Sequence, residues 1–232
     1  YDTLEGVIGI HGPEIGSLRE MGVTYAQVEP DENGGLDLPA IRAAMKPNTR
    51  VVAVQRSRGY SARRSLTPEE MEPLAQMLHT EFPHACLMVD NCYGEFVRLK
   101  EPTHYGADVC VGSLIKNPGG GLAPTGGYMA GRKDLIERIS YRLTAPSVGL
   151  EIGSYAAGYQ PFYQGLFMAP HVVAQAVKTA TLAAAVFTDI GMKTTPDVNE
   201  PRTDIIQALE MGTPERLVAF CQGIQAASPV DS

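Results

Sequence analysis

The sequence predicts an α/β fold built on a mostly parallel sheet. Short apolar runs alternate with amphipathic helical patterns along the first 143 residues. The apolar runs are continuous rather than alternating, which is typical of parallel strands with helices on both faces of the sheet. With 44% hydrophobic and 19% charged residues over 232 positions, the chain can bury a sizeable core.

Each predicted element rests on a local signal. Strands are expected at residues 23–28, 50–54, 85–90, 107–113 and 126–131, and helices at 36–46, 67–81 and 133–143. Asp37 is a good N-cap for the first helix, and Pro39 falls in its first turn. Thr67 and Glu70 form a capping-box pattern at the start of the second. The apolar residues of that helix fall on one face at helical spacing: Met71, Leu74, Ala75 and Leu78.

The pattern changes after residue 143. Residues 144–170 predict a glycine-rich loop that carries the aromatic residues Tyr155, Tyr159, Phe162, Tyr163 and Phe167. A long helix is expected at about 171–189, then a strand-turn-strand segment, then a helix at 213–227 that begins with Thr213 and Pro214. We therefore predict a large domain at 1–170 and the start of a small α+β domain at 171–232, with further sequence expected beyond each end.

Composition argues against several classes of protein. The net charge of −7 is unlike that of a nucleic-acid binder. The longest apolar stretch is interrupted by Gln175 and Lys178, so it predicts a helix rather than a membrane span. The histidines are scattered and the cysteines lack paired spacing, so no metal site is expected. Reduced thiols predict a cytoplasmic protein.

Two charged residues follow neighbouring strands of the predicted sheet. Asp90 ends the strand at 85–90, and Lys116 comes three residues after Ser113, where the strand at 107–113 ends. Ligands of parallel sheets lie beyond the carboxyl ends of the strands. A loop lysine can also be a solvated surface residue, and an aspartate after a strand often caps a turn. Together, however, the two residues are the parts that a pyridoxal phosphate (PLP) site needs.

The chemistry of such a site gives each residue a role. A lysine amine can form a Schiff base with the aldehyde of PLP, and an ionised aspartate keeps the pyridine nitrogen protonated. The lysine must lose its proton to attack, and burial beside the cofactor lowers the pKa of an amine. Ser113 can offer a hydroxyl to the phosphate, and the glycines after Lys116 would let backbone approach a ligand.

At these positions the sequence resembles a known family. The segments "VDNCYGEF" at 89–96 and "GADVCVGSLIKNPGGG" at 106–121 resemble the core of the PLP-dependent Cys/Met-metabolism enzymes. The segments "QRSRGYS" at 55–61 and "IKNPGGGLAPTGGY" at 115–128 are similar to the methionine γ-lyase-like branch, often called aluminium resistance proteins. The resemblance implies the aspartate-aminotransferase-like fold type I. It also implies that Asp90, Ser113 and Lys116 bind pyridoxal 5′-phosphate.

The resemblance extends to a further residue and also has gaps. Tyr1 opens "YDTL", similar to a Tyr-x-x-Thr segment whose ring stacks on the cofactor in the wider family. Ile115 replaces the hydroxyl residue that precedes the lysine there, and "QRSRGYS" replaces an Asn-Pro segment. The upstream phosphate-binding glycine loop and the small-domain arginine that binds the substrate carboxylate are absent from this sequence.

Other residues could complete the site. Arg56 and Arg58 follow the strand at 50–54, and arginine forks bind carboxylates bidentately, so both are candidates for substrate binding. They could equally belong to a solvated basic loop that continues to Arg63 and Arg64. Tyr93 could line the cofactor site or be a half-buried packing residue.

These residues predict a carbon–sulfur lyase that acts on sulfur-containing amino acids by β- or γ-elimination. Lys116 would remove the Cα proton of the substrate as general base. Another fold-type I PLP enzyme, such as an aminotransferase, a decarboxylase or an aldolase, would contain the same lysine and aspartate. A non-catalytic fragment or assembly subunit is the alternative from another class. The resemblance implies a homodimer or homotetramer, and no nucleic-acid or membrane partner is expected.

Overall fold

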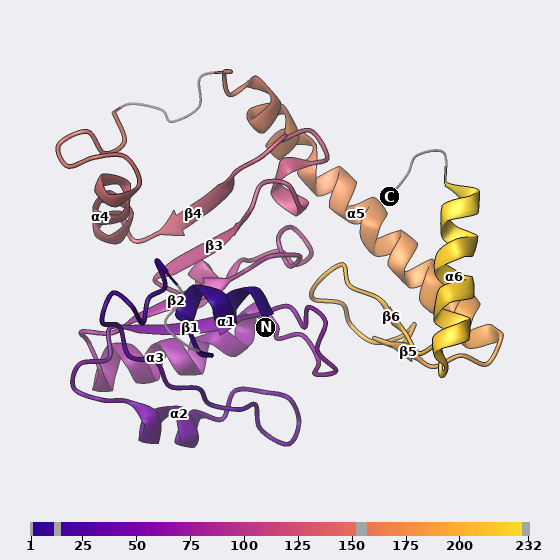
Figure 1. The fold of residues 1–232 in the computed structure, drawn as a ribbon, viewed down its shortest axis with the longest axis horizontal. Helices are drawn as coiled ribbons and strands as arrows, with labels where there is room; N and C mark the ends of the chain where they lie inside the picture. The colour runs from indigo at the N-terminus through magenta and orange to yellow at the C-terminus, as the bar shows by residue number, and fades with distance from the viewer. Residues whose placement is uncertain (1, 12–14, 152–156, 229–232) are drawn as a thin grey trace. The chain divides into compact units, whose positions relative to one another are not determined.

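The computed structural model describes residues 2–11, 15–151 and 157–228. The chain divides into two compact units, Tyr1–Thr49 and Arg50–Ser232. The second unit holds every predicted site residue except Tyr1, which lies outside the described residues. Figure 1 shows the order of the elements along the chain.

A four-stranded sheet forms the centre of the second unit (Figure 1). Its order is β1 (Val51–Gln55), β2 (Cys86–Asp90), β3 (Val109–Ser113) and β4 (Gly127–Gly131). The first three strands are parallel, with Gln55 opposite Asp90 and Asp90 opposite Val111, while β4 runs antiparallel to β3. The prediction of a mostly parallel α/β sheet is therefore confirmed.

The helix predicted at 67–81 packs against β2 and builds the core. A single 3₁₀ turn, η1 (Pro68–Glu70), leads into α3 (Met71–Glu81), and the capping box of Thr67 and Glu70 is present. The predicted apolar face is buried, since Met71, Leu74 and Leu78 have no exposed surface. Leu87 and Val89 of β2 are also fully buried, so helix and strand share one apolar layer.

The last strand of this sheet leads into a helix at the predicted position. α4 (Lys133–Leu143) begins two residues after β4 and has the bounds that the sequence indicates. Arg132 and Asp134 form an ion pair at its start, 2.8 Å from Nη2 to Oδ2. Arg132 also reaches Asp108 before β3, so β3 and α4 are tied together beside β4.

One helix boundary differs from the prediction. α5 spans Gln160–Asp189, so its first turns occupy the segment expected as loop. Pro161 sits in the first turn, where a missing N–H costs no helical hydrogen bond, and Pro170 lies inside the helix. The prediction was wrong because proline and glycine at 161–170 were taken as loop signals. Residue 170, the predicted domain boundary, lies within α5, and the domain division itself stays a prediction.

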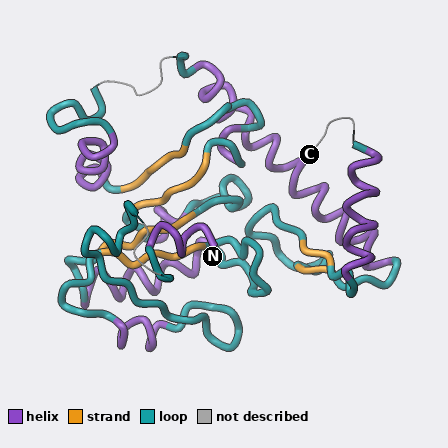
Figure 2. The backbone as a smooth tube through the Cα atoms, viewed as in Figure 1, coloured by secondary structure: helices purple, strands orange, loops and turns teal. Residues whose placement is uncertain are grey.

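A short hairpin and a final helix follow α5. β5 (Thr194–Thr195) pairs antiparallel with β6 (Ala208–Leu209), as Figure 2 shows, which confirms the strand-turn-strand prediction in a minimal form. α6 (Pro214–Ala227) begins at Thr213, whose hydroxyl oxygen accepts a hydrogen bond from the Arg216 N–H at 3.3 Å.

The first unit, Tyr1–Thr49, contains two short helices, α1 (Asp2–Ile8) and α2 (Leu38–Ala44). Asp37 caps α2 as predicted, because its Oδ1 accepts the Ala40 N–H at 2.9 Å. The strand predicted at 23–28 is wrong, since these residues form no ladder with any described strand. Val23 and Tyr25 are about half exposed, so the apolar pattern has no packed layer to bury it.

No helix among the described residues is long and apolar enough to cross a membrane.

Candidate functional site

Asp90 and Lys116 come from neighbouring parallel strands and meet at one edge of the sheet. Asp90 is the last residue of β2 and pairs with Val111 of β3. Lys116 follows β3 by three residues, where its backbone N–H donates to the Ser113 carbonyl at 3.3 Å. Because β2 and β3 run in the same direction, both side chains emerge at the carboxyl ends of the strands.

The thiol of Cys92 lies within reach of both groups. The pKa of this thiol is raised to about 11: burial is the largest cause, the Asp90 carboxylate also raises it, and Lys116 lowers it. Opposite charges therefore act on one sulfur atom from two strands. Both predicted groups therefore lie close to Cys92.

The protein groups around Lys116 stabilise its protonated form. Its Nζ lies 4.4 Å from the centroid of the Tyr93 ring, a cation–π distance. Burial is the largest influence and lowers the pKa of Lys116, but Cys92 and Tyr93 raise it, and the resulting pKa lies above its ordinary value. The expected lowering of this pKa is therefore not produced by the chain's own residues.

The backbone around the two groups is shaped for the site. Tyr93 has a φ of +70°, a left-handed conformation that is uncommon outside glycine and often marks functional positions. The side chain of Asp90 is oriented by the Cys92 N–H, which donates to its Oδ1 at 3.0 Å. Ser113 is half-buried, and its hydroxyl oxygen accepts the Ile115 N–H at 3.3 Å. The Tyr93 ring lies beside the Lys116 amine. This contact favours the hypothesis that Tyr93 lines the cofactor site over the hypothesis that it only packs.

The glycines that follow Lys116 serve helix packing. A Cβ on Gly120 would lie 2.3 Å from the Gly165 carbonyl oxygen, and one on Gly165 would lie 2.1 Å from the Gly119 carbonyl oxygen. Bare backbone therefore lets α5 sit directly on η3 (Asn117–Gly119), the turn after Lys116. The sequence had suggested that these glycines approach a ligand. Gly119 and Gly120 contact α5, but nothing lies within 4 Å of a Cβ added to Gly121, so the close approach of a ligand to these glycines stays a prediction.

Arg56 is buried and bonded to protein groups. Only 1% of its surface is exposed. Its Nε donates to the Leu66 carbonyl at 3.0 Å, its Nη1 to the Asn91 side chain, and its Nη2 to the Thr203 carbonyl and hydroxyl at 2.7 and 2.9 Å. Burial lowers the pKa of this guanidinium, which Glu101 and Asp204 partly offset. These contacts join β1 to the hairpin segment, and substrate binding by Arg56 stays a prediction.

Arg58 is also buried and lies beside the same hairpin. Its Nε donates to the Ser61 carbonyl at 3.0 Å and its Nη1 to the Thr195 carbonyl at 3.4 Å. Neither arginine belongs to a solvated loop, so that alternative is wrong for Arg56 and Arg58. A role of Arg58 in substrate binding likewise stays a prediction.

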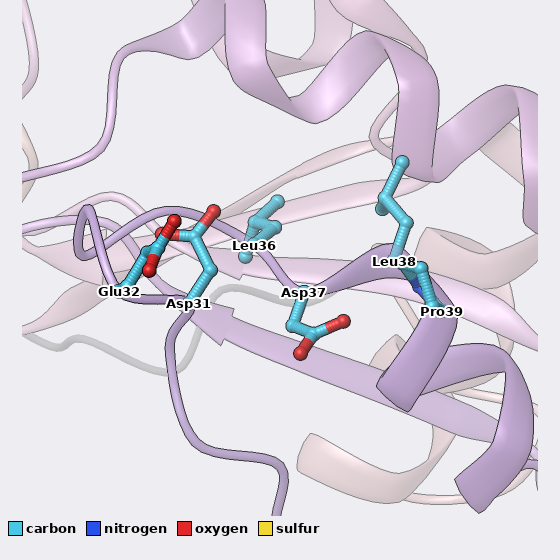
Figure 3. Close-up of a pocket in the computed structure, with 6 residues that line it drawn as sticks. All are labelled: Asp31, Glu32, Leu36, Asp37, Leu38 and Pro39. Carbon is cyan, nitrogen blue, oxygen red and sulfur yellow. The ribbon is translucent and has the colours of Figure 1, made fainter.

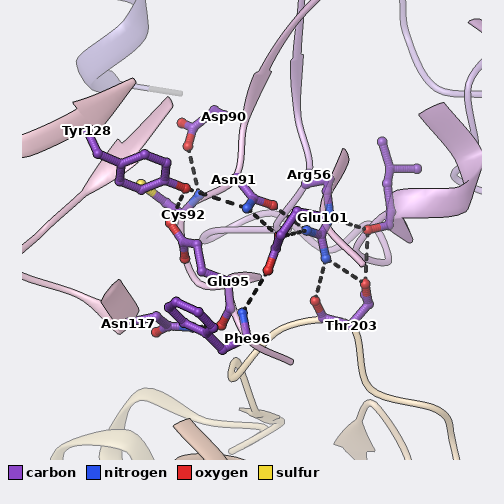
Figure 4. Close-up of polar contacts among 11 residues, drawn as sticks. Arg56, Asp90, Asn91, Cys92, Glu95, Phe96, Glu101, Asn117, Tyr128 and Thr203 are labelled. Atoms are coloured by element: carbon purple, nitrogen blue, oxygen red, sulfur yellow. Dashed lines mark hydrogen bonds and ion pairs between the residues drawn. The ribbon is translucent and has the colours of Figure 1, made fainter. Parts of the chain in front are cut away.

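A polar network behind the site escaped the sequence analysis (Figure 4). It joins Arg56, Asn91 and Glu101 to Tyr128, Glu95 and Asn117. Two of its residues are sequence neighbours of predicted site residues, since Asn91 follows Asp90 and Asn117 follows Lys116. Their positions in the sequence could have indicated the network. Cys92 was missed for the same reason, since it was weighed as a buried thiol and not as a neighbour of Asp90.

The donor set fits PLP. An amine, a carboxylate and a hydroxyl come from Lys116, Asp90 and Ser113 at one sheet edge, and the first two act on a common neighbour. No group of acidic, histidine or cysteine side chains among the described residues could hold a metal ion. The fold and this edge define an α/β protein with an aspartate and a lysine at the carboxyl ends of two neighbouring parallel strands.

The first unit also contains a pocket, and it holds none of the predicted site residues (Figure 3). It is lined by Asp31, Glu32, Leu36, Asp37, Leu38 and Pro39. Asp31 accepts the N–H groups of Asn33 and Gly35 at 2.8 and 2.7 Å, and Asp37 caps α2. These carboxylates are thus used in turns and caps.

The chain belongs to the methionine gamma-lyase family, whose model matches residues 1–232. It is 44% identical to the uncharacterised protein YnbB of Bacillus subtilis, matching 100% of this chain and 55% of that protein. It is 24% identical over 135 residues to the L-methionine gamma-lyase of Treponema denticola, matching 58% of this chain and 31% of that enzyme.

Solved structures of similar proteins extend the comparison. A candidate cystathionine β-lyase involved in aluminium resistance from Listeria monocytogenes has 47% identity and a TM-score of 0.95 over 100% of this chain and 57% of that one. A carbon–sulfur lyase involved in aluminium resistance from Clostridium novyi has 44% identity and a TM-score of 0.93 over 100% and 56%. This chain therefore spans little more than half of each. The family resemblance seen in the sequence is confirmed.

A more distant structure shares the fold alone. The cystathionine gamma-lyase of Lactobacillus plantarum, solved with L-serine, is 18% identical, with a TM-score of 0.58 over 83% of this chain and 45% of that one.

Proposed function

We propose that the protein is a PLP-dependent carbon–sulfur lyase of fold type I that acts on sulfur-containing amino acids. The observation that carries this is the convergence of Lys116 and Asp90 at the carboxyl edge of β2 and β3. Family membership and the lyase names of similar proteins support the same reaction class.

Each residue has a defined part in binding. Lys116 would hold PLP covalently through its amine, Asp90 would pair with the protonated pyridine nitrogen, and Ser113 would donate its hydroxyl to the phosphate. The ring of Tyr93, already within 4.4 Å of the lysine, would line the same space. When bound, PLP withdraws electrons from the substrate Cα and makes its C–H acidic.

Lys116 then serves as the base for the reaction. With its amine free, Lys116 would accept the Cα proton of the bound substrate. In a β-elimination, the electron pair left on Cα would form a double bond to Cβ as the thiolate leaves and takes up a proton. A γ-elimination would first need a second proton to be removed, from Cβ. Hydrolysis of the remaining unsaturated amino acid releases ammonia and a 2-oxo acid. The Asp90 carboxylate would balance the positive charge of the ring nitrogen.

The proposal also includes the location, the oligomeric state and the partners of the protein. We expect a cytoplasmic homodimer or homotetramer with a small-molecule amino-acid substrate. Neither nucleic acid nor a membrane is expected as a partner.

The test compares two lysine variants with the unaltered protein. Cystathionine and methionine are offered with PLP, and released thiol and 2-oxo acid are measured separately. Lys116→Ala should lower turnover by roughly 10²–10⁴-fold, the usual contribution of a general base. Lys100→Ala is the control, because Lys100 also lies over a tyrosine ring, that of Tyr105 at 6.0 Å, but it precedes β3 and does not follow the carboxyl end of that strand. It should leave turnover unchanged.

Product analysis separates the rival reactions. A lyase forms thiol and ammonia without a second 2-oxo acid, whereas an aminotransferase needs one as acceptor. Carbon dioxide release would indicate a decarboxylase, and release of an aldehyde would indicate an aldolase. Turnover of neither amino acid, together with no visible colour on adding PLP, would contradict the proposal and favour the non-catalytic alternative.

A further inference from the structure

A buried carboxyl group, Glu95, lies directly behind the lysine–aspartate site. It follows β2 by five residues, and only 3% of its surface is exposed. Its Oε1 accepts a hydrogen bond from the Tyr128 hydroxyl at 2.9 Å. Its Oε2 is buried and makes no hydrogen bond with any residue that the structure describes. A buried polar atom without a partner is rare and costly, so it calls for an explanation.

Glu95 contacts the chain neighbours of two predicted cofactor residues. The side-chain amide of Asn117, next to Lys116, donates to the Glu95 backbone carbonyl at 3.0 Å. Gly112, next to Ser113, has space for no side chain, because a Cβ there would lie 2.5 Å from the Glu95 Oε1. Glu95 is therefore packed between the end of β3 and the turn that carries Lys116.

Tyr128 links Glu95 to Asn91, the chain neighbour of the third predicted cofactor residue, Asp90. The hydroxyl of Tyr128 bridges Glu95 and the side chain of Asn91, which follows Asp90, with a longer contact of 3.5 Å from Asn91 Nδ2. Asn91 is held in turn by Glu101, to which its Nδ2 donates at 2.8 Å, and by Arg56. Figure 4 shows these side chains converging from separate segments. Glu95 thus contacts the neighbours of all three predicted cofactor residues: that of Lys116 through its backbone carbonyl, that of Ser113 through its carboxyl group, and that of Asp90 through the Tyr128 hydroxyl.

The surroundings of Glu95 favour its neutral form. The pKa of Glu95 is raised to about 7. Burial is the largest cause and Glu101 adds to it, while the backbone N–H of Glu95, the Tyr128 hydroxyl and Arg56 lower it. Two titratable thiols lie nearby, Cys92 and Cys110. Burial is the largest cause that raises their pKa values, to about 11 and about 12, and the Glu95 charge adds a smaller increase, so both stay neutral. Arg56 and Glu101 are thus the charged groups that face Glu95.

We propose that Glu95 is a positioning residue that holds the ends of β2 and β3 and the Lys116 turn in place as a neutral carboxylic acid. Ionisation of Glu95 leaves a charged oxygen buried without a hydrogen-bond partner, which is energetically costly. This cost falls when the Lys116 turn moves away from Glu95. The cofactor site is then less well formed. The inference rests on the proposed function, because it assigns a role to Glu95 in organising that site.

The test measures affinity for pyridoxine 5′-phosphate between pH 5.5 and 8.5. This probe has no aldehyde and so cannot bond to Lys116, which removes the lysine's own deprotonation from the measurement. Glutamine has the shape of the neutral acid and cannot ionise, so Glu95→Gln shows the pH dependence that does not come from Glu95. As the pH rises through 7, the affinity of the unaltered protein should fall by about three- to tenfold more than the affinity of this variant. Identical pH profiles for the two proteins would overturn the role of Glu95.

Glu69→Gln is the matched control. Glu69 also accepts a hydrogen bond from a tyrosine, Tyr105 at 3.1 Å, and its Oε2 is also buried without a partner among the described residues. Its pKa is lowered rather than raised: burial opposes this, but its backbone N–H, Tyr105 and Arg98 prevail. This variant should therefore keep the full loss of affinity for pyridoxine 5′-phosphate through pH 7, which we call the pH step. Loss of the step in Glu69→Gln would show that the step does not report on Glu95.

A second variant keeps the inference testable if Glu95→Gln fails to fold. Tyr128→Phe removes the hydroxyl that stabilises the ionised form, so the midpoint of the step should rise by about one pH unit. An unchanged midpoint would contradict the assignment.

A measurement without any ligand separates this inference from the proposed function. Amide hydrogen exchange at residues 112–120 is compared between the unaltered protein and Glu95→Gln at each pH. The unaltered protein should exchange faster than the variant at pH 8 and equally at pH 5.5. If no protein binds the probe but this difference appears, PLP binding fails while Glu95 keeps its positioning role. Equal exchange at both pH values would contradict that role.

Discussion

Asp108 shows how a single buried carboxylate can join three segments of the second unit. It is 2% exposed, and its Oδ2 accepts the Leu87 N–H at 2.7 Å while its Oδ1 accepts from Arg132 Nη1 at 3.0 Å. His79 of α3 lies 3.2 Å from Oδ2. Burial alone would raise the pKa of Asp108, but the Leu87 N–H, Arg132 and His79 together lower it. The folded state therefore stabilises the ionised form.

Asp108→Asn should lower the free energy of unfolding at pH 7 by roughly 1–3 kcal/mol, the usual cost of weakening such buried hydrogen bonds. The sign of the pH effect follows from the lowered pKa. The ionised Asp108 contributes its full stabilisation at pH values above the ordinary pKa of an aspartate. This contribution is lost as the pH falls through the lower pKa that Asp108 has in the folded protein. Urea unfolding at pH 7 and in acid measures this, and the variant should show the smaller acid loss.

Asp134→Asn is the matched control, because Asp134 bonds the same arginine at 2.8 Å but its side chain is 59% exposed. A destabilisation as large as that of Asp108→Asn would contradict the special role of the buried carboxylate.

Single residues were predicted where chemistry alone identifies them. Asp90, Ser113 and Lys116 could be proposed because few residue types can hold PLP, and strand ends give their location. Arg56 could not be placed, since a sequence does not show which arginine finds protein partners and which faces a ligand. Glu95 was missed because its burial depends on contacts with Tyr128 and Gly112 that are distant in the chain.

Among the elements, the contact of α5 with the Lys116 turn links packing to the site. Gly165 of the helix lies against Gly119 and Gly120 of the turn, and no side chain fits between them. The backbone of α5 thus sets how far the turn after Lys116 can move. The beginning of this helix was missed, because its packing partner at residues 119–120 is a tertiary contact that local signals do not contain.

Gly165→Ala should destabilise the protein, although alanine is the better helix former by about 1 kcal/mol. Its Cβ would lie 2.1 Å from the Gly119 carbonyl oxygen, which belongs to backbone and cannot rotate away. We expect a lower unfolding free energy and weaker PLP binding, measured by thermal unfolding and by titration. Gly223→Ala in α6 is the comparison, since nothing lies within 4 Å of its added Cβ. A Gly165→Ala protein as stable as Gly223→Ala would contradict the close contact.

For the whole molecule, the alternation of apolar runs and amphipathic helices predicted the sheet correctly. The positions of β1 to β4, their mostly parallel arrangement and the buried face of α3 follow from local patterns, whereas the strand expected at 23–28 does not form. The tie between the end of β1 and the hairpin could not be predicted. It depends on Arg56 with Thr203 and on Ser57 with Asp204, which are 147 residues apart in each pair.

The central claim at this scale is that two neighbouring parallel strands bring one amine and one carboxylate to a common cofactor. The most direct measurement is borohydride reduction of the protein mixed with PLP, followed by peptide mass spectrometry to locate the attached cofactor. We predict a single modified residue, Lys116, with Asp90→Asn weakening the attachment and Lys100→Ala leaving it intact. Attachment that persists at another lysine in Lys116→Ala, or attachment that Asp90→Asn leaves unchanged, would contradict the account.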